Sequence, residues 1–289
     1  MFTWAILPRL AHNSLLELWH EATVSGAGWI ARTNFSPIEP GACVDWSILI
    51  VAGVIILAAS TISGITGFGF GLISVPPLLI FFDPSAVLTI TKVLTISTTW
   101  IVIASAWREL QPRLLLRILP FSFIGALLGL QLLRVASAEA IKVFASSIVV
   151  AFSLLLLRGL PQREFKSRLL APLAGFVSGT MSTTTALSGP PIILYFTITK
   201  VPVQTFRVTI ASYFVLLDLF GLPALIRGDF VTKHDFKIAL LMVPMAFAGR
   251  WWGSRLSHRF SREQFYRLTL IILIATGGLG TVVSTLALL

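Results

Sequence analysis

Long apolar segments constrain this chain more than any other feature. Five of them, each about 20 residues long, lie near residues 86–106, 114–133, 138–157, 204–226 and 265–286. A helix of about 20 apolar residues crosses the ~30 Å hydrocarbon layer of a bilayer. Two longer apolar stretches, 46–82 and 169–199, are interrupted by small and polar residues, and 236–252 is a shorter apolar segment. The sequence therefore predicts an all-α, polytopic membrane protein with about eight transmembrane helices.

The composition argues against most other classes of protein. Hydrophobic residues make up 56 % of the chain and charged residues only 12 %, which is not the composition of a soluble domain. The apolar segments lack the period-two alternation of an outer-membrane barrel. All four histidines lie in the N-terminal tail or in loops, and neither HExxH nor GxSxG occurs, so we expect no enzyme, metal site or cofactor. Cys43 is the only cysteine, which excludes an intramolecular disulfide.

The apolar part of the chain is duplicated. Residues 74–78 (SVPPL) recur as 188–192 (SGPPI), 114 residues later. Five further residues recur at a constant offset of 124, namely Pro120, Gly125, Gly129, Ser137 and Glu139, which return as Pro244, Gly249, Gly253, Ser261 and Glu263. Five identities at one offset indicate two homologous repeats. We read the glycines as packing elements and the Ser and Glu pairs as helix starts.

The repeats define the expected domains. Residues 1–44 form an N-terminal extension without the pattern of a secretory signal, and we expect it to be retained. The first repeat spans 46–160, a basic linker spans 161–168, and the second repeat spans 169–289. If the interrupted stretch of each repeat re-enters the membrane, the second repeat is inverted, and if it crosses, the repeats are parallel. The sequence leaves both open, and transporters with broken helices favour inversion.

The net charge of +10 has two explanations. Lys and Arg collect in cytoplasmic loops of membrane proteins, and a positive surface also attracts anionic substrates. Basic residues gather at 108–117 and 158–168. Two uninterrupted predicted spans separate these clusters, so both clusters lie on the same side of the membrane. We expect that side to be cytoplasmic and the protein to lie in the cell (inner or plasma) membrane. Nucleic acid is not an expected partner, and homo-oligomer formation is left open.

Each repeat opens with a break in its apolar segment. Glycines fill the first break, 64–71, and hydroxyl residues fill the second, 178–189; a Pro-Pro pair follows each. We interpret each break as the end of one half-helix and the start of another, with the prolines in the first turn of the second half-helix. A helix that starts inside the membrane presents free N–H groups and a positive dipole, which favour an anion. The alternative is tight helix packing through small residues. The predicted binding residues in the breaks are Gly67, Gly69, Gly71, Pro76, Thr183, Thr184, Thr185, Ser188, Gly189 and Pro190.

Few ionisable residues lie inside the predicted spans, where such residues are functional candidates. Lys92 and Arg207 occupy matching positions of the two repeats, 115 residues apart, and we expect them to hold an oxyanion between the halves. The alternative is that both side chains snorkel to the headgroups. Asp218 has no acidic counterpart in the first repeat. It is either a protonation site that couples transport or a structural acid near a helix bend.

The two breaks and the duplicated layout of 46–289 resemble those of the sulfite exporter TauE/SafE family, also called the 4-toluene sulfonate uptake permease family. The resemblance implies a secondary transporter of small anions such as sulfite, an organosulfonate or an organic acid, coupled to an ion gradient that we expect to be protons. This chain differs from the family pattern in two places. Phe68 and Phe70 separate the first-break glycines, and a threonine run replaces much of the second glycine cluster. An anion channel and a membrane protein without transport function are the alternatives.

Overall fold

The computed structural model describes residues 46–157, 169–199 and 201–256 of the chain. These residues form helices and no strand, as the sequence predicts. The predicted tail 1–44, the linker 161–168 and the predicted span 265–286 lie outside the described residues. The helices are α2 (Trp46–Thr66), α3 (Phe70–Phe81), α4 (Pro84–Thr98), α5 (Trp100–Ala106), the short 3-10 helix η1 (Trp107–Glu109), α6 (Pro112–Val135), α7 (Ala138–Leu157), α8 (Leu170–Thr184), α9 (Gly189–Ile198), α10 (Val203–Arg227) and α11 (Lys233–Leu256).

Four segments in the described part of the chain are long and apolar enough to cross a membrane. They are Trp46–Thr66, Pro84–Ala104, Pro112–Val135 and Thr205–Arg227. The predicted span 138–157 forms the 20-residue helix α7. Helix α11 has 24 residues, Lys233–Leu256, and extends beyond the predicted segment 236–252 at both ends.

Both predicted breaks separate two helices. The first lies between Thr66, the last residue of α2, and Phe70, the first of α3, and the second lies between α8 and α9. In the first break, Gly67 and Gly69 have φ angles of 82° and 90°, which glycine adopts without steric cost. In the second, Ala186 has a φ of 60°. The interpretation of each break as the junction of two half-helices is confirmed.

The predicted place of the Pro-Pro pair in the first turn is correct for one break and wrong for the other. Pro190 lies in the first turn of α9, whereas Pro76 and Pro77 lie inside α3. The difference arises because the positive φ of Gly69 lets the helix begin at Phe70, six residues before Pro76. Proline has no N–H, so the carbonyls of Leu72 and Ile73 receive no helical hydrogen bond from positions 76 and 77.

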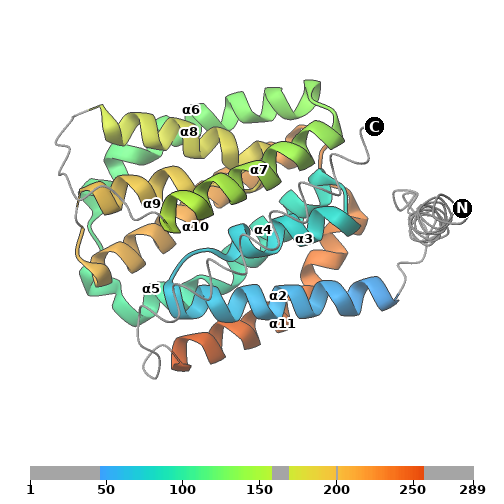
Figure 1. Cartoon of the computed structure of the whole chain (residues 1–289), viewed down its shortest axis with the longest axis horizontal. Helices are drawn as coiled ribbons and strands as arrows, with labels where there is room; N and C mark the ends of the chain where they lie inside the picture. The colour runs from blue at the N-terminus through green and yellow to red at the C-terminus, as the bar shows by residue number, and fades with distance from the viewer. Residues whose placement is uncertain (1–45, 158–168, 200, 257–289) are drawn as a thin grey trace, which may run out of the picture. The chain divides into compact units, whose positions relative to one another are not determined.

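Two closely packed helix pairs lie on opposite sides of this part of the chain, with α3, α4, α9 and α10 between them (Figure 1). One pair is α6 with α8, and the other is α2 with α11. Each contact depends on glycine. A Cβ atom at Gly125 or Gly129 of α6 would overlap backbone of α8, and one at Gly249 or Gly253 of α11 would overlap backbone of α2. The predicted role of these glycines in close helix packing is confirmed.

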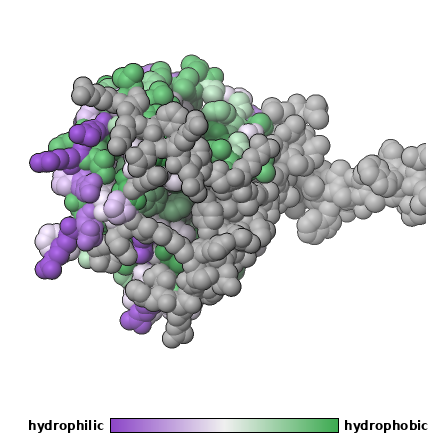
Figure 2. Space-filling view, turned by 60° about the vertical axis from the view of Figure 1, so that its left-hand side comes forward, coloured by the Kyte–Doolittle hydropathy of each residue, from purple (hydrophilic) through white to green (hydrophobic). Residues whose placement is uncertain are grey.

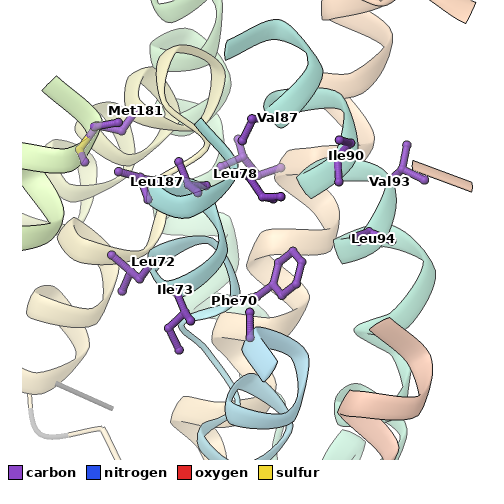
Figure 3. Close-up of a cluster of buried hydrophobic side chains, with 14 of the residues drawn as sticks. Phe70, Leu72, Ile73, Leu78, Val87, Ile90, Val93, Leu94, Met181 and Leu187 are labelled. Carbon is purple, nitrogen blue, oxygen red and sulfur yellow. The ribbon is translucent and has the colours of Figure 1, made fainter. Parts of the chain in front are cut away.

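The core between the pairs is apolar, and so is much of the outer surface. Leu72 and Leu78 of α3, Val87 of α4, Met181 of α8 and Leu187 of the second break belong to one buried cluster (Figure 3). Figure 2 shows hydrophobic side chains over much of the described face, with hydrophilic ones gathered along one edge. Large apolar side chains face outward on α6 and α11. An exposed apolar surface of this kind suits contact with lipid.

Candidate functional site

A small cavity lies where the two breaks meet. Its volume is about 50 Å³. The contact between the breaks is direct, because a Cβ atom at Gly71 would meet the carbonyl oxygen of Ala186 at 2.8 Å. Residues of the first break, the second break, α2, α4, α10 and α11 surround the cavity, among them Ser63, Gly67, Gly69, Gly71, Lys92, Thr95, Thr99, Ser182, Ser188, Gly189, Asp218 and Arg250.

The N-termini of two half-helices border this cavity. Gly69 and Phe70 line it at the start of α3, and Ser188 and Gly189 line it at the start of α9. The first N–H groups of a helix have no acceptor within the helix, and the helix dipole adds a partial positive charge there. Two such ends at one cavity create an environment that favours an anion.

Lys92 and Asp218 form a buried ion pair on the wall of the cavity. The Lys92 Nζ atom lies 2.8 Å from Asp218 Oδ1 and donates a second hydrogen bond to Ser182 Oγ at 2.9 Å. The Lys92 side chain is 2 % exposed, so its ammonium group does not extend to the protein surface, as snorkelling would require. The sequence singled out both residues but did not predict that they pair.

Arg250 of α11 is a second buried cation at the cavity, and it was missed from the sequence. Its Nη1 donates to Thr99 Oγ1 at 2.6 Å and its Nη2 donates to Ser63 Oγ at 3.3 Å. The guanidinium carbon lies 5.9 Å from the centre of the Phe70 ring. The available signal was an arginine inside the apolar segment 236–252, one residue after a packing glycine.

The structure brings only part of the predicted site, binding residues and the coupling residue together, to the cavity. Seven of the predicted residues line it: Gly67, Gly69, Gly71, Lys92, Ser188, Gly189 and Asp218. Six are not among the lining residues: Pro76, Thr183, Thr184, Thr185, Pro190 and Arg207. The Arg207 side chain lies against Gly67, and its Nη2 is 3.4 Å from the carbonyl oxygen of Gly64. Lys92 and Arg207 therefore do not share the cavity.

The three consecutive threonines of the second break donate their hydroxyls to backbone carbonyls. Thr183 Oγ1 donates to the Ala126 carbonyl at 2.8 Å, across the contact between α8 and α6. Thr184 and Thr185 donate to carbonyls four residues earlier in α8, at 2.9 and 3.0 Å. Threonine within a helix commonly makes this local bond. In this structure the threonine hydroxyls support the helix end, and the cavity is lined instead by Ser182 and Ser188.

A chain of buried hydroxyls fixes the start of α9, and the sequence did not reveal it. Tyr213 Oη is 2.9 Å from Ser122 Oγ and donates to Ser178 Oγ at 2.8 Å. Ser178 in turn donates to the carbonyl of Ser188 at 2.5 Å. Helices α6, α8 and α10 are thereby linked to the second break. A lone tyrosine in an apolar span was the only signal in the sequence.

The sulfite exporter TauE/SafE family model matches residues 51–279. The match spans both breaks and every residue that lines the cavity. No curated protein and no solved structure matches the chain.

Proposed function

Because the chain belongs to the sulfite exporter TauE/SafE family, we propose that it is a secondary transporter of a small sulfur oxyanion, such as sulfite or an organosulfonate, in the cytoplasmic membrane. The observation that carries the proposal is the cavity at the two breaks. In the described part of the chain, two helix N-termini, Lys92 and Arg250 surround it, and Asp218 is the one carboxylate that lines it. This arrangement is suited to an anion and would repel a cation.

The size of the cavity bears on the substrate. A single water needs about 10–15 Å³ of volume measured in this way, so about 50 Å³ accommodates a few water molecules or one compact oxyanion. An aromatic sulfonate is larger and would require the site to open. We therefore propose that the described conformation is a closed state and that a compact oxyanion is the better substrate.

We further propose that the two repeats are inverted. Lys92 and Arg207 are equivalent by the repeat, so α4 and the first part of α10 are counterparts. Lys92 of α4 lies beside Gly221 of α10, and Thr95, one turn later in α4, lines the same cavity as Asp218, one turn earlier in α10. Counterpart helices that run antiparallel are the arrangement expected of inverted repeats and not of parallel ones.

Asp218 is the proposed coupling residue. In the ion pair the negative charge of Asp218 holds the Lys92 ammonium group. When Asp218 takes up a proton, the pair loses its attraction and the Lys92 ammonium becomes available to the anion. Binding of a proton and binding of an anion then favour each other, which is the requirement for coupled transport.

The experiment is a measurement of substrate-induced charge movement in proteoliposomes that contain the full-length protein. Sulfite, sulfate, methanesulfonate, sulfoacetate, toluenesulfonate and chloride are compared with and without a pH gradient. A saturable signal for a sulfur oxyanion that depends on the proton gradient supports the carrier. A current proportional to voltage, without dependence on the gradient, would instead favour an anion channel. Silence with every anion, from protein shown to be folded, would refute the proposed function.

A further inference from the structure

The charges at the cavity are not balanced. Among the residues that the structure describes, three charged side chains line it: Lys92, Asp218 and Arg250. The first two form an ion pair at 2.8 Å and neutralise each other. In the described part of the chain no carboxylate forms an ion pair with Arg250. One positive charge is therefore left without a counter-charge.

The surroundings of Arg250 explain why this charge matters. The residue is 3 % exposed, and its two hydrogen-bond partners are the neutral hydroxyls of Thr99 and Ser63. Its Nε atom is buried and has no hydrogen-bond partner among the described residues. Burial of an unpaired charge costs several kcal/mol. An anion in the cavity would remove that cost by supplying both the missing charge and acceptors for the remaining N–H donors.

The neighbouring groups place this charge where an anion would bind. The guanidinium group lies over the ring of Phe70, and Phe70 is the first residue of α3, whose N-terminus borders the cavity. Lys92 is less available, because an anion has to compete with Asp218 for its ammonium group. Arg207 does not line the cavity.

We infer that Arg250 is the principal anion-binding residue of this site and that the single excess charge makes the site selective for a singly charged oxyanion over a doubly charged one. This inference rests on the proposed function and adds the charge class of its substrate. An anion of charge −1 neutralises the three side chains completely. A dianion leaves a net negative charge in a buried site unless Asp218 is protonated or replaced.

The test compares two probes of similar size whose charges are fixed near neutral pH, methanesulfonate (−1) and sulfate (−2). Dissociation constants are measured by calorimetry with purified full-length protein in detergent at one salt concentration. The wild-type protein is expected to bind methanesulfonate more tightly than sulfate. Arg250→Gln should weaken methanesulfonate binding by roughly 30-fold or more, since it removes one partner of a buried charge pair. Arg250→Lys should recover part of the loss.

Removing the Asp218 charge, alone and together with the Arg250 charge, distinguishes anion binding by Arg250 from a merely structural role. Asp218→Asn raises the excess charge to two, and the preference should shift towards sulfate. The double variant Asp218→Asn/Arg250→Gln returns the excess to one, now on Lys92, and should regain methanesulfonate binding relative to Arg250→Gln. A structural role of Arg250 predicts no such recovery. Arg255→Gln is the matched control, because Arg255 is exposed on the same helix, stacks on Trp251 and should have no effect.

The outcomes distinguish the two levels of the proposal. Failure of the wild-type protein to bind or transport any anion of the panel would refute the proposed function. Wild-type binding with Arg250→Gln within about threefold of it, or a wild-type preference for sulfate, would overturn this inference alone. If Arg250→Gln does not fold, the Asp218→Asn variant decides, since an unchanged ratio of the two dissociation constants would also overturn it.

Discussion

The buried ion pair between Lys92 and Asp218 should show strong energetic coupling. The two residues come from α4 and α10, are 126 positions apart in the sequence, and have side chains 2 % and 11 % exposed. The perturbation is a double-mutant cycle of Lys92→Met, Asp218→Asn and both together. Methionine keeps most of the apolar length of lysine, and asparagine keeps the shape of aspartate, so that charge is the main change.

The distance sets the expected magnitude. Two unit charges 2.8 Å apart attract each other by about 6 kcal/mol at an effective dielectric constant of about 20. Desolvation of both ions offsets much of this gain. Each single substitution leaves one buried charge unpaired and should cost about 3 kcal/mol of unfolding free energy. The double variant has neither charge and should cost less than the sum of the two, with a coupling energy of at least about 1.5 kcal/mol.

The assay is unfolding of the purified protein by sodium dodecyl sulfate in mixed micelles, followed by the fluorescence of its 8 tryptophans. Lys92→Met combined with Asp229→Asn is the control, because Asp229 is exposed and tolerates asparagine at its φ of 60°. That control should be additive. Additivity of Lys92→Met and Asp218→Asn within about 0.5 kcal/mol, the behaviour of independent sites, would refute the assignment of a coupled ion pair.

Three further predictions concern packing, the hydroxyl chain and topology. Gly179→Ala should destabilise the protein by about 1–3 kcal/mol or more, because its Cβ would overlap backbone of α6. Gly53→Ala is the control and should be nearly neutral, since no atom lies nearer than 3.9 Å to its added Cβ. The same unfolding assay compares the two variants, and equal losses of stability would contradict the helix packing. Tyr213→Phe should cost about 1–2 kcal/mol, because it removes the hydroxyl that bonds to both Ser122 and Ser178, and an unchanged unfolding midpoint would argue against the hydroxyl chain. In a Cys43→Ala background, Gln111→Cys should react with a membrane-impermeant thiol reagent from the cytoplasmic side and Asp229→Cys from the other, and reaction of both from one side would contradict the proposed topology.

The two breaks could be predicted from the sequence because their signals are local. Small, hydroxyl and proline residues interrupt otherwise continuous apolar segments, and lipid does not tolerate irregular backbone unless protein or water surrounds it. Glycine at 67 and 69 permitted the positive φ angles that end one helix and begin the next. The position of Pro76 within α3 was not predictable in the same way, since a proline pair is compatible with a first turn and, at a cost, with a helix interior.

The site itself depends on contacts between distant parts of the chain. Lys92 and Asp218 were each identified as ionisable residues inside predicted spans, but nothing in either local sequence specifies a partner on another helix. Arg250 lies inside the predicted segment 236–252, but nothing in its local sequence indicates that it reaches Thr99 and Ser63 at a cavity formed with other helices. The hydroxyls of Thr183 to Thr185 looked like ligands for an anion, and their chemistry does not distinguish that role from hydrogen bonds to nearby carbonyls.

The central claim is that the transported anion occupies the cavity between the two breaks. The most direct test is protection of Ser188→Cys, in a Cys43→Ala background, against a thiol reagent in proteoliposomes. The account predicts that a saturating concentration of the panel anion that these liposomes transport slows labelling at position 188. Labelling of Asp229→Cys, at an exposed position between α10 and α11, should be unchanged. Equal labelling of Ser188→Cys with and without an anion that the same protein transports would contradict the claim.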